Sequence, residues 1–158
     1  MTTDPTYMDT LLQNLKSPDE AVREMATQKL WRAWFEQKGL VGFQVLQRAQ
    51  ELIDAEELNQ AEVLLSQLIQ NLPDFAEAWN RRAVLYFMQR RYRKAIADCQ
   101  QVVQLNANHF GALHGLGLCY AALEDYRAAI QAFQRVLAIH PYAVETQRLL
   151  LECTAHLS

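Results

Sequence analysis

The sequence is poor in the residues that interrupt helices, since its 158 residues include only 5 glycines and 4 prolines. This scarcity excludes a collagen-like chain and a glycine- and proline-rich disordered chain, and it argues against a sandwich of many short strands joined by tight turns. Hydrophobic residues make up 51% of the chain and charged residues 21%. Because folding at this length removes roughly 70% of the unfolded chain's surface from water, we expect a self-standing, mainly helical core.

An excess of charge, a long hydrophobic run and a paired-cysteine motif are lacking too. The formal net charge of −3 provides no overall attraction to nucleic acid or to an anionic membrane. No apolar run approaches the roughly 18 residues that a membrane span requires, and acidic residues stand where a signal peptide is basic. The three cysteines contain no C-x-x-C pair. We therefore expect a cytoplasmic protein without a membrane span.

Motifs of enzymes and metal sites are also missing. The sequence contains no glycine-rich phosphate loop, no G-x-S-x-G and no H-E-x-x-H. His109, His114 and Cys119 are spaced five residues apart, and on one helix this spacing rotates successive side chains by about 140°, so they do not converge on a metal. We expect no catalytic residue, no metal and no cofactor.

The chain repeats itself every 34 residues, because a shift of this length aligns Ala61, Ala95 and Ala129 in one column. Columns of large residues surround it: Leu58, Tyr92 and Tyr126; Leu65, Cys99 and Phe133; Val45, Trp79 and Leu113; and Leu52, Tyr86 and Tyr120. This period is typical of helix–turn–helix units in which small residues let two backbones approach and large residues fill the wedge between them. Since one unit cannot bury its apolar face alone, we expect three units to stack.

The second and third units carry motifs that resemble a known repeat. The motifs are Trp79-x-x-Arg82-Ala83-x-x-Tyr86 with Ala95-x-x-x-Cys99, and Leu113-x-x-Leu116-Gly117-x-x-Tyr120 with Ala129-x-x-x-Phe133 and Pro141. Over residues 42–141 the chain is similar to the tetratricopeptide repeat (TPR) family, and in particular to small free-standing bacterial and plastid members. The resemblance implies an all-α, right-handed α-solenoid that binds other proteins on its concave face.

The organisation that we predict has three parts. The TPR units span about residues 42–75, 76–109 and 110–143, a two-helix N-terminal extension covers residues 1–41, and a C-terminal capping helix covers residues 142–158. The apolar face of the extension carries Trp31 and Trp34, and we expect it to cover the otherwise exposed first unit.

The resemblance places the first helix of each unit on the concave face. The candidate peptide-binding residues are Leu46, Gln50, Ile53, Glu77, Asn80, Val84, Phe87, Gly111, His114 and Leu118, with Phe43 and Ala121 in the same columns. Asn80 and His114 resemble by position the polar groups that hold a bound peptide backbone in this family. Two further interpretations stay open: the groove is merely surface, or the protein's own N-terminal helices occupy it.

One turn is unusually basic, and we treat it as an accessory basic patch. It consists of Arg81, Arg90, Arg91, Arg93 and Lys94, whereas the equivalent turns of the other units hold Glu56-Glu57 and Glu124-Asp125. The patch either pairs with neighbouring acids, stays solvated, or attracts an acidic partner. Phosphate binding by so few charges would be weak and sensitive to salt.

These observations predict a non-enzymatic scaffold or adaptor that binds a partly apolar peptide or helix of another protein. Family members that grip the C-terminal carboxylate of chaperones carry lysine, asparagine and arginine where this chain has Leu46, Gln50, Arg81, Gly111 and Gly115, so we expect no such ligand. Two alternatives remain: a homo-oligomer formed through the N-terminal helices, and weak binding of nucleic acid or an anionic surface by the basic patch.

Overall fold

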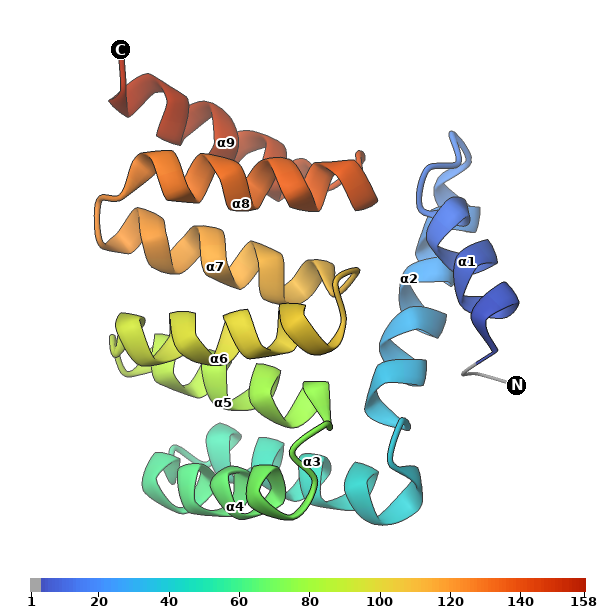
Figure 1. Ribbon diagram of the computed structural model, residues 1–158, viewed down its shortest axis with the longest axis vertical. Coiled ribbons are helices and arrows are strands. Elements are labelled where there is room, and N and C mark those ends of the chain that lie inside the picture. The colour runs from blue at the N-terminus through green and yellow to red at the C-terminus, as the bar shows by residue number, and fades with distance from the viewer. Residues whose placement is uncertain (1–3) are drawn as a thin grey trace.

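The computed structural model describes residues 4–158, which form nine helices and no strand (Figure 1). The helices are α1 (Pro5–Asn14), α2 (Glu20–Phe35), α3 (Gly39–Asp54), α4 (Leu58–Asn71), α5 (Ala76–Met88), α6 (Tyr92–Leu105), α7 (Phe110–Ala122), α8 (Tyr126–Ile139) and α9 (Val144–His156). The predicted all-α fold is confirmed. The first three residues of the predicted extension lie outside the described part of the chain, within which no helix combines the length and apolarity needed to cross a bilayer.

Helices α3 to α9 stack as sequential antiparallel neighbours (Figure 1). The turns inside the three helix pairs share one backbone device, a residue with a positive φ at Glu56, Arg90 and Glu124, where φ is 60°, 60° and 61°. The next residue's amide then donates back across the helix end, as from Arg91 to the Tyr86 carbonyl at 2.9 Å. A helix that ends on a residue in the left-handed backbone conformation usually has glycine at that position. In this chain Glu56, Arg90 and Glu124 occupy the position instead.

The repeated columns form the core of the stack. Ala61, Ala95 and Ala129 are fully buried, as expected for positions where two helices approach closely. At Gly117 two helices approach so closely that a Cβ atom there would lie 2.2 Å from the ring of Phe133. The alternation of small and large residues therefore packs the helix pairs as the sequence predicted.

The N-terminal arm, residues 4–35, is a hairpin of α1 and α2 that lies across the ends of the stacked helices (Figure 1). Its buried leucines Leu11, Leu15 and Leu30 belong to the same core cluster as Phe110, Leu113 and Val136. Trp34 stacks on His109, with ring centroids 4.3 Å apart.

The expectation that Trp31 and Trp34 cover the first unit is therefore wrong, because both pack at the start of α7. The reason is the reversal that follows α2, where Gly39 adopts a φ of 71° at the start of α3. Because of this reversal, α2 runs across the ends of the stacked helices toward α7, and it does not pack as one more layer beside α3 (Figure 1). Only Phe35, at the end of α2, packs against the core of α3 and α4.

Candidate protein-binding groove

A cavity of about 210 Å³ lies between α5 and α7. It is lined by Asn80, Val84, Phe87, Gly111, His114 and Leu118, which are six of the ten predicted groove residues, together with Ala83, Cys99, Gly115 and Cys119. Gly115 helps to create this space, because it removes a side chain from the face of α7 that lies toward Cys99. We call it the central cavity.

The lining of the central cavity is apolar apart from the side chains of Asn80 and His114. Asn80 is almost fully buried and donates from Nδ2 to Glu77 Oε1 at 3.0 Å. His114 Nδ1 lies 2.9 Å from the Thr146 hydroxyl, and burial lowers the pKa of this histidine, so its ring is neutral at pH 7. Val84 keeps 41% of its surface exposed. The cavity can therefore accept an apolar side chain.

Two cavity residues, Cys99 and Cys119, were not among the predicted groove residues. Both thiols are buried and free. Burial raises the pKa of Cys99 far above its ordinary value and raises that of Cys119 to about 11. Both thiols therefore stay protonated at neutral pH and act as soft apolar surface. A Cβ atom at Gly115 would lie 3.3 Å from Cys99 Sγ, so the absence of a side chain at Gly115 leaves the Cys99 thiol beside the cavity.

A second cavity of about 300 Å³, the lateral cavity, lies where α2, α3 and α5 meet. It is lined by Phe35, Phe43, Leu46, Gln47, Gln50 and Arg81. Two of these are predicted groove residues, and Arg81 comes from the predicted basic patch. Phe35 belongs to the arm, and no repeat column of the sequence pointed to it.

Glu77 does not line an open groove, because its side chain is completely buried at the point where the arm meets α5 and α7. Its Oε2 accepts a hydrogen bond from His109 Nε2 at 2.9 Å, and its Oε1 lies 3.5 Å from the Arg81 guanidinium. His109 Nδ1 accepts from the Ala112 amide, which leaves the ring proton on Nε2. The carboxylate therefore organises the interior instead of meeting a ligand.

The remaining predicted groove residues are partly covered as well. A Cβ atom at Gly111 would lie 2.5 Å from the ring of Trp31, so the arm closes this end of the groove. Ile53 is buried in the core of α3 and α4 and lines neither cavity. Leu46 is also buried and forms only the back of the lateral cavity. The interpretation that the N-terminal helices occupy the groove thus describes its Gly111 end, whereas Val84, at the central cavity, and Arg81, in the lateral cavity, keep exposed surface.

The basic patch is split by internal ion pairs. Arg91 lies 2.7 Å from Glu62, and this pairing lowers the pKa of the Glu62 carboxyl. Arg81 is held by Glu77 and by a hydrogen bond to Gln50. Arg90, Arg93 and Lys94 are exposed. The structure therefore leaves three of the five predicted charges facing solvent.

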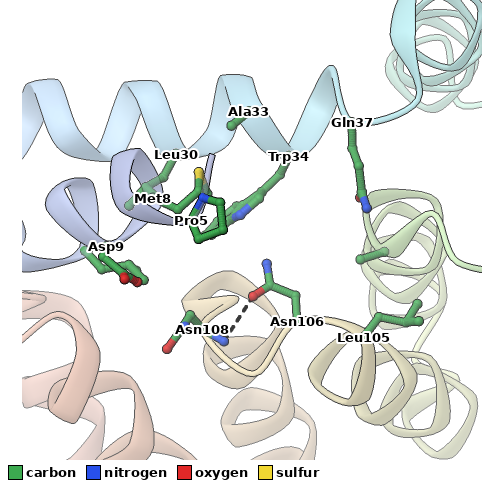
Figure 2. A pocket seen from close by; sticks show the side chains of 12 residues that line it. Pro5, Met8, Asp9, Leu30, Ala33, Trp34, Gln37, Leu105, Asn106 and Asn108 are labelled. Carbon is green, nitrogen blue, oxygen red and sulfur yellow. Dashed lines mark hydrogen bonds between the residues drawn. The ribbon is translucent and has the colours of Figure 1, made fainter. Parts of the chain in front are cut away.

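A further cavity of about 290 Å³ lies between the arm and the stack. Figure 2 shows Met8, Leu30 and Trp34 on the arm side of this space and Asn106 and Asn108 on the loop between α6 and α7. The backbone amide of Asn108 donates a hydrogen bond to Asn106 Oδ1 at 3.1 Å, and this bond shapes that loop. The cavity shows that the arm docks on the stack without filling the whole space beneath it.

The stacked helix pairs and their apolar cleft define an α-solenoid repeat protein. The family model described as tetratricopeptide repeat matches residues 76–109 and 111–142, so this part of the chain is similar to tetratricopeptide repeats.

Comparison with known proteins identifies relatives of this repeat region. A TPR repeat-containing protein of Rhizobium etli is 34% identical over 97 residues, which cover 61% of this chain and 48% of that protein. A BBSome complex member BBS4 homolog of Drosophila melanogaster is 28% identical over 73% of this chain and 23% of its own length. The chain thus spans about half of the first relative and about a quarter of the second. The first TPR of Spaghetti (RPAP3), solved with an HSP90 peptide, superposes with a TM-score of 0.70 at 21% identity, over 72% of this chain and 90% of that one.

Proposed function

We propose that this chain is a non-enzymatic interaction module that holds an apolar side chain of another protein in the central cavity, and so acts as a scaffold or adaptor. The observation that carries the proposal is the cavity itself, which is apolar, about 210 Å³ in volume and bordered by Asn80 and His114. An apolar protein cavity of about 150 Å³ binds benzene, so this one is large enough for a single bulky side chain.

The family relationship supports binding of a peptide. The solved TPR domain of Spaghetti was bound to an HSP90 peptide, and a TPR domain of yeast Sti1 was solved in a complex with pHsp70. At 21% and 16% identity, these two structures share only their fold with this chain. We therefore argue the ligand of this chain from its own residues. A grooved α-solenoid surface that receives an extended or helical segment is a recurrent mode of peptide recognition.

We propose that the partner is not the C-terminal tail of a chaperone. The positions where clamp-bearing members have lysine, asparagine or arginine hold Leu46, Gln50, Arg81, Gly111 and Gly115 here. Leu46 and Gly111 carry no charge and cannot pair with a carboxylate. Both positions are also covered, since Leu46 is buried and Gly111 lies beneath Trp31. A partner with an apolar anchor fits the site better.

The alternative of self-association through the N-terminal helices receives less support. Trp34 is only 7% exposed and stacks on His109, while Trp31 packs on the same histidine with ring centroids 5.2 Å apart. These aromatic side chains are used inside one chain and offer little surface to a second.

Affinity capture from a lysate of the native organism tests the groove. The variant is Val84→Asp, which puts a charge at the mouth of the central cavity. The matched control is Val63→Asp, at an exposed valine of α4 away from both cavities. We expect a partner that wild type and the control retain and Val84→Asp loses. Equal retention by all three baits would place the contact elsewhere and reject the proposed site.

A further inference from the structure

We infer that the lateral cavity binds a neutral aromatic side chain of the partner segment, with the N-terminal arm forming one wall of the site. The inference deepens the proposed function and rests on it. It depends on two observations. Arg81 contacts Phe35 of the arm and Gln50 of α3, and the carboxylate of the buried Glu77 lies beside its guanidinium.

The guanidinium of Arg81 is fixed in its plane. One terminal nitrogen donates to Gln50 Oε1 at 2.9 Å, and the other lies 3.5 Å from Glu77 Oε1. The third nitrogen, Nε, is buried and has no hydrogen-bond partner. The side chain keeps 20% of its surface exposed in the lateral cavity. With Nε buried and the two terminal nitrogens beside Gln50 and Glu77, the group has few donors left for a ligand, so a ring against its flat face is the contact that we propose.

The charge balance of the site favours a neutral ring over a carboxylate. The buried Glu77 already compensates Arg81, and His109 adds no charge because its Nδ1 accepts from a backbone amide while its Nε2 donates to Glu77. A carboxylate would therefore meet a neutral pair and lose its hydration without a free counter-charge. An aromatic ring carries negative potential on its face and no net charge, so its attraction to the guanidinium costs little desolvation.

The walls of the lateral cavity also suit an aromatic ring. Phe35 lies with its ring centroid 4.9 Å from the Arg81 guanidinium carbon, and Phe43 and Leu46 close the apolar side. At about 300 Å³ the cavity is larger than the central cavity of about 210 Å³. The arm contributes Phe35, so this site is incomplete without α2.

The two cavities flank α5 and predict a spacing in the ligand. Neighbouring packed helices lie about 8–10 Å apart, and a chain in the polyproline II conformation advances about 3.1 Å per residue and presents every third side chain to the same face. A segment that crosses α5 therefore reaches both cavities with side chains three positions apart. The partner class is an extended segment with an aromatic residue and, three residues away, an aliphatic residue.

Titration of the full chain with single-residue amides, followed by NMR, tests the inference. The probes are N-acetyltryptophanamide, N-acetylleucinamide and N-acetylaspartic acid amide. We expect the tryptophan probe to shift the side-chain signals of Arg81 and Gln50. Arg81→Lys, which keeps the charge beside Glu77 but removes the flat face, should weaken its binding about fivefold. Arg93→Lys, at an exposed site on α6, is the matched control and should leave the affinity unchanged.

Three results would overturn the inference. They are no shift at Arg81 up to the solubility limit of the tryptophan probe, tighter binding of the aspartate probe at Arg81, and equal affinity in wild type and Arg81→Lys. Phe35→Ala is the second variant and should also weaken the tryptophan probe, because it removes the wall that the arm supplies. The outcome is separable from the proposed function, which Val84→Asp tests at the other cavity with a protein partner.

Discussion

The repeat stack and the N-terminal arm are both helical, but they are held by different kinds of contact. In the stack each helix packs against its neighbours in sequence, through columns such as Ala61, Ala95 and Ala129 that recur every 34 residues. In the arm, Leu15 and Trp34 pack against Phe110 and His109, which follow them by about 75 residues or more. Repetition makes the stack's contacts visible in the sequence, whereas the arm's docking surface occurs only once.

Gly117→Leu should be the most damaging change, because the ring of Phe133 leaves no room for a side chain at this position. A Cβ atom there would already lie 2.2 Å from the fully buried ring of Phe133. Overpacking of this kind costs about 3 kcal/mol or more. Urea unfolding followed by circular dichroism measures the loss. Gly115→Ala is the control, since its Cβ atom would meet only Cys99 Sγ at 3.3 Å. Wild-type stability of Gly117→Leu would contradict the packing described.

Trp34→Ala should release the arm and leave the stack folded. Removing a buried tryptophan costs about 3–5 kcal/mol when the site cannot collapse, and here the loss falls on the contact between α2 and His109. Hydrogen exchange should show faster exchange in α1 and α2, with α6 and α8 still protected. Met25→Ala, at a 58% exposed position of α2, is the control. Loss of protection throughout the chain would show that arm and stack fold as one unit.

Acidic pH should destabilise both regions through two histidines. Burial lowers the pKa of His114, inside the stack, and of His140, where the Arg23 charge of the arm lowers it further. Both rings bind fewer protons folded than unfolded, so their contribution is complete above the unfolded pKa of about 6.5 and declines as the pH falls below it. Urea midpoints one unit above and one unit below that pKa measure the effect. His114→Asn with His140→Asn should flatten the dependence, and an unchanged slope would assign it to other groups.

The smallest expected effect is a gain in stability at the turns of the stack. Arg90 and Glu124 adopt a positive φ of 60° and 61°, which glycine adopts without steric cost. Arg90→Gly and Glu124→Gly should each stabilise the protein by about 0.5 kcal/mol. The control is Ala97→Gly, in the interior of α6, which should destabilise it by about 1 kcal/mol. A loss of stability from Arg90→Gly would mean that its side chain makes contacts that outweigh the backbone strain.

The sequence predicted the helical fold and much of the central cavity, because both depend on position within a repeat. Val84 and Leu118 occupy one column, Asn80 and His114 another, and the structure brings all four to the same cavity. The lateral cavity was only partly predictable. Its Gln50 and Leu46 lie in the columns, but Phe35 comes from the arm, where no repeat assigns a direction to a side chain.

The burial of Glu77 could not be predicted from its column for the same reason. A charged residue on the first turn of a groove helix is normally expected to face solvent. Its burial depends on His109, Asn80 and Arg81 supplying partners, and on the arm excluding water above them. Those partners converge only when elements distant in sequence have docked.

The helical class, the period of the stack and the identity of its packing residues can be predicted from the amino-acid sequence, because nearest-neighbour packing of repeated units obeys a fixed spacing. The position of the arm, the part of the groove that it covers and the pairing of charges in the interior follow instead from how the folded elements dock. These depend on a single reversal at Gly39 and on shape complementarity between α2 and α7, which occur once in the chain and leave no periodic trace.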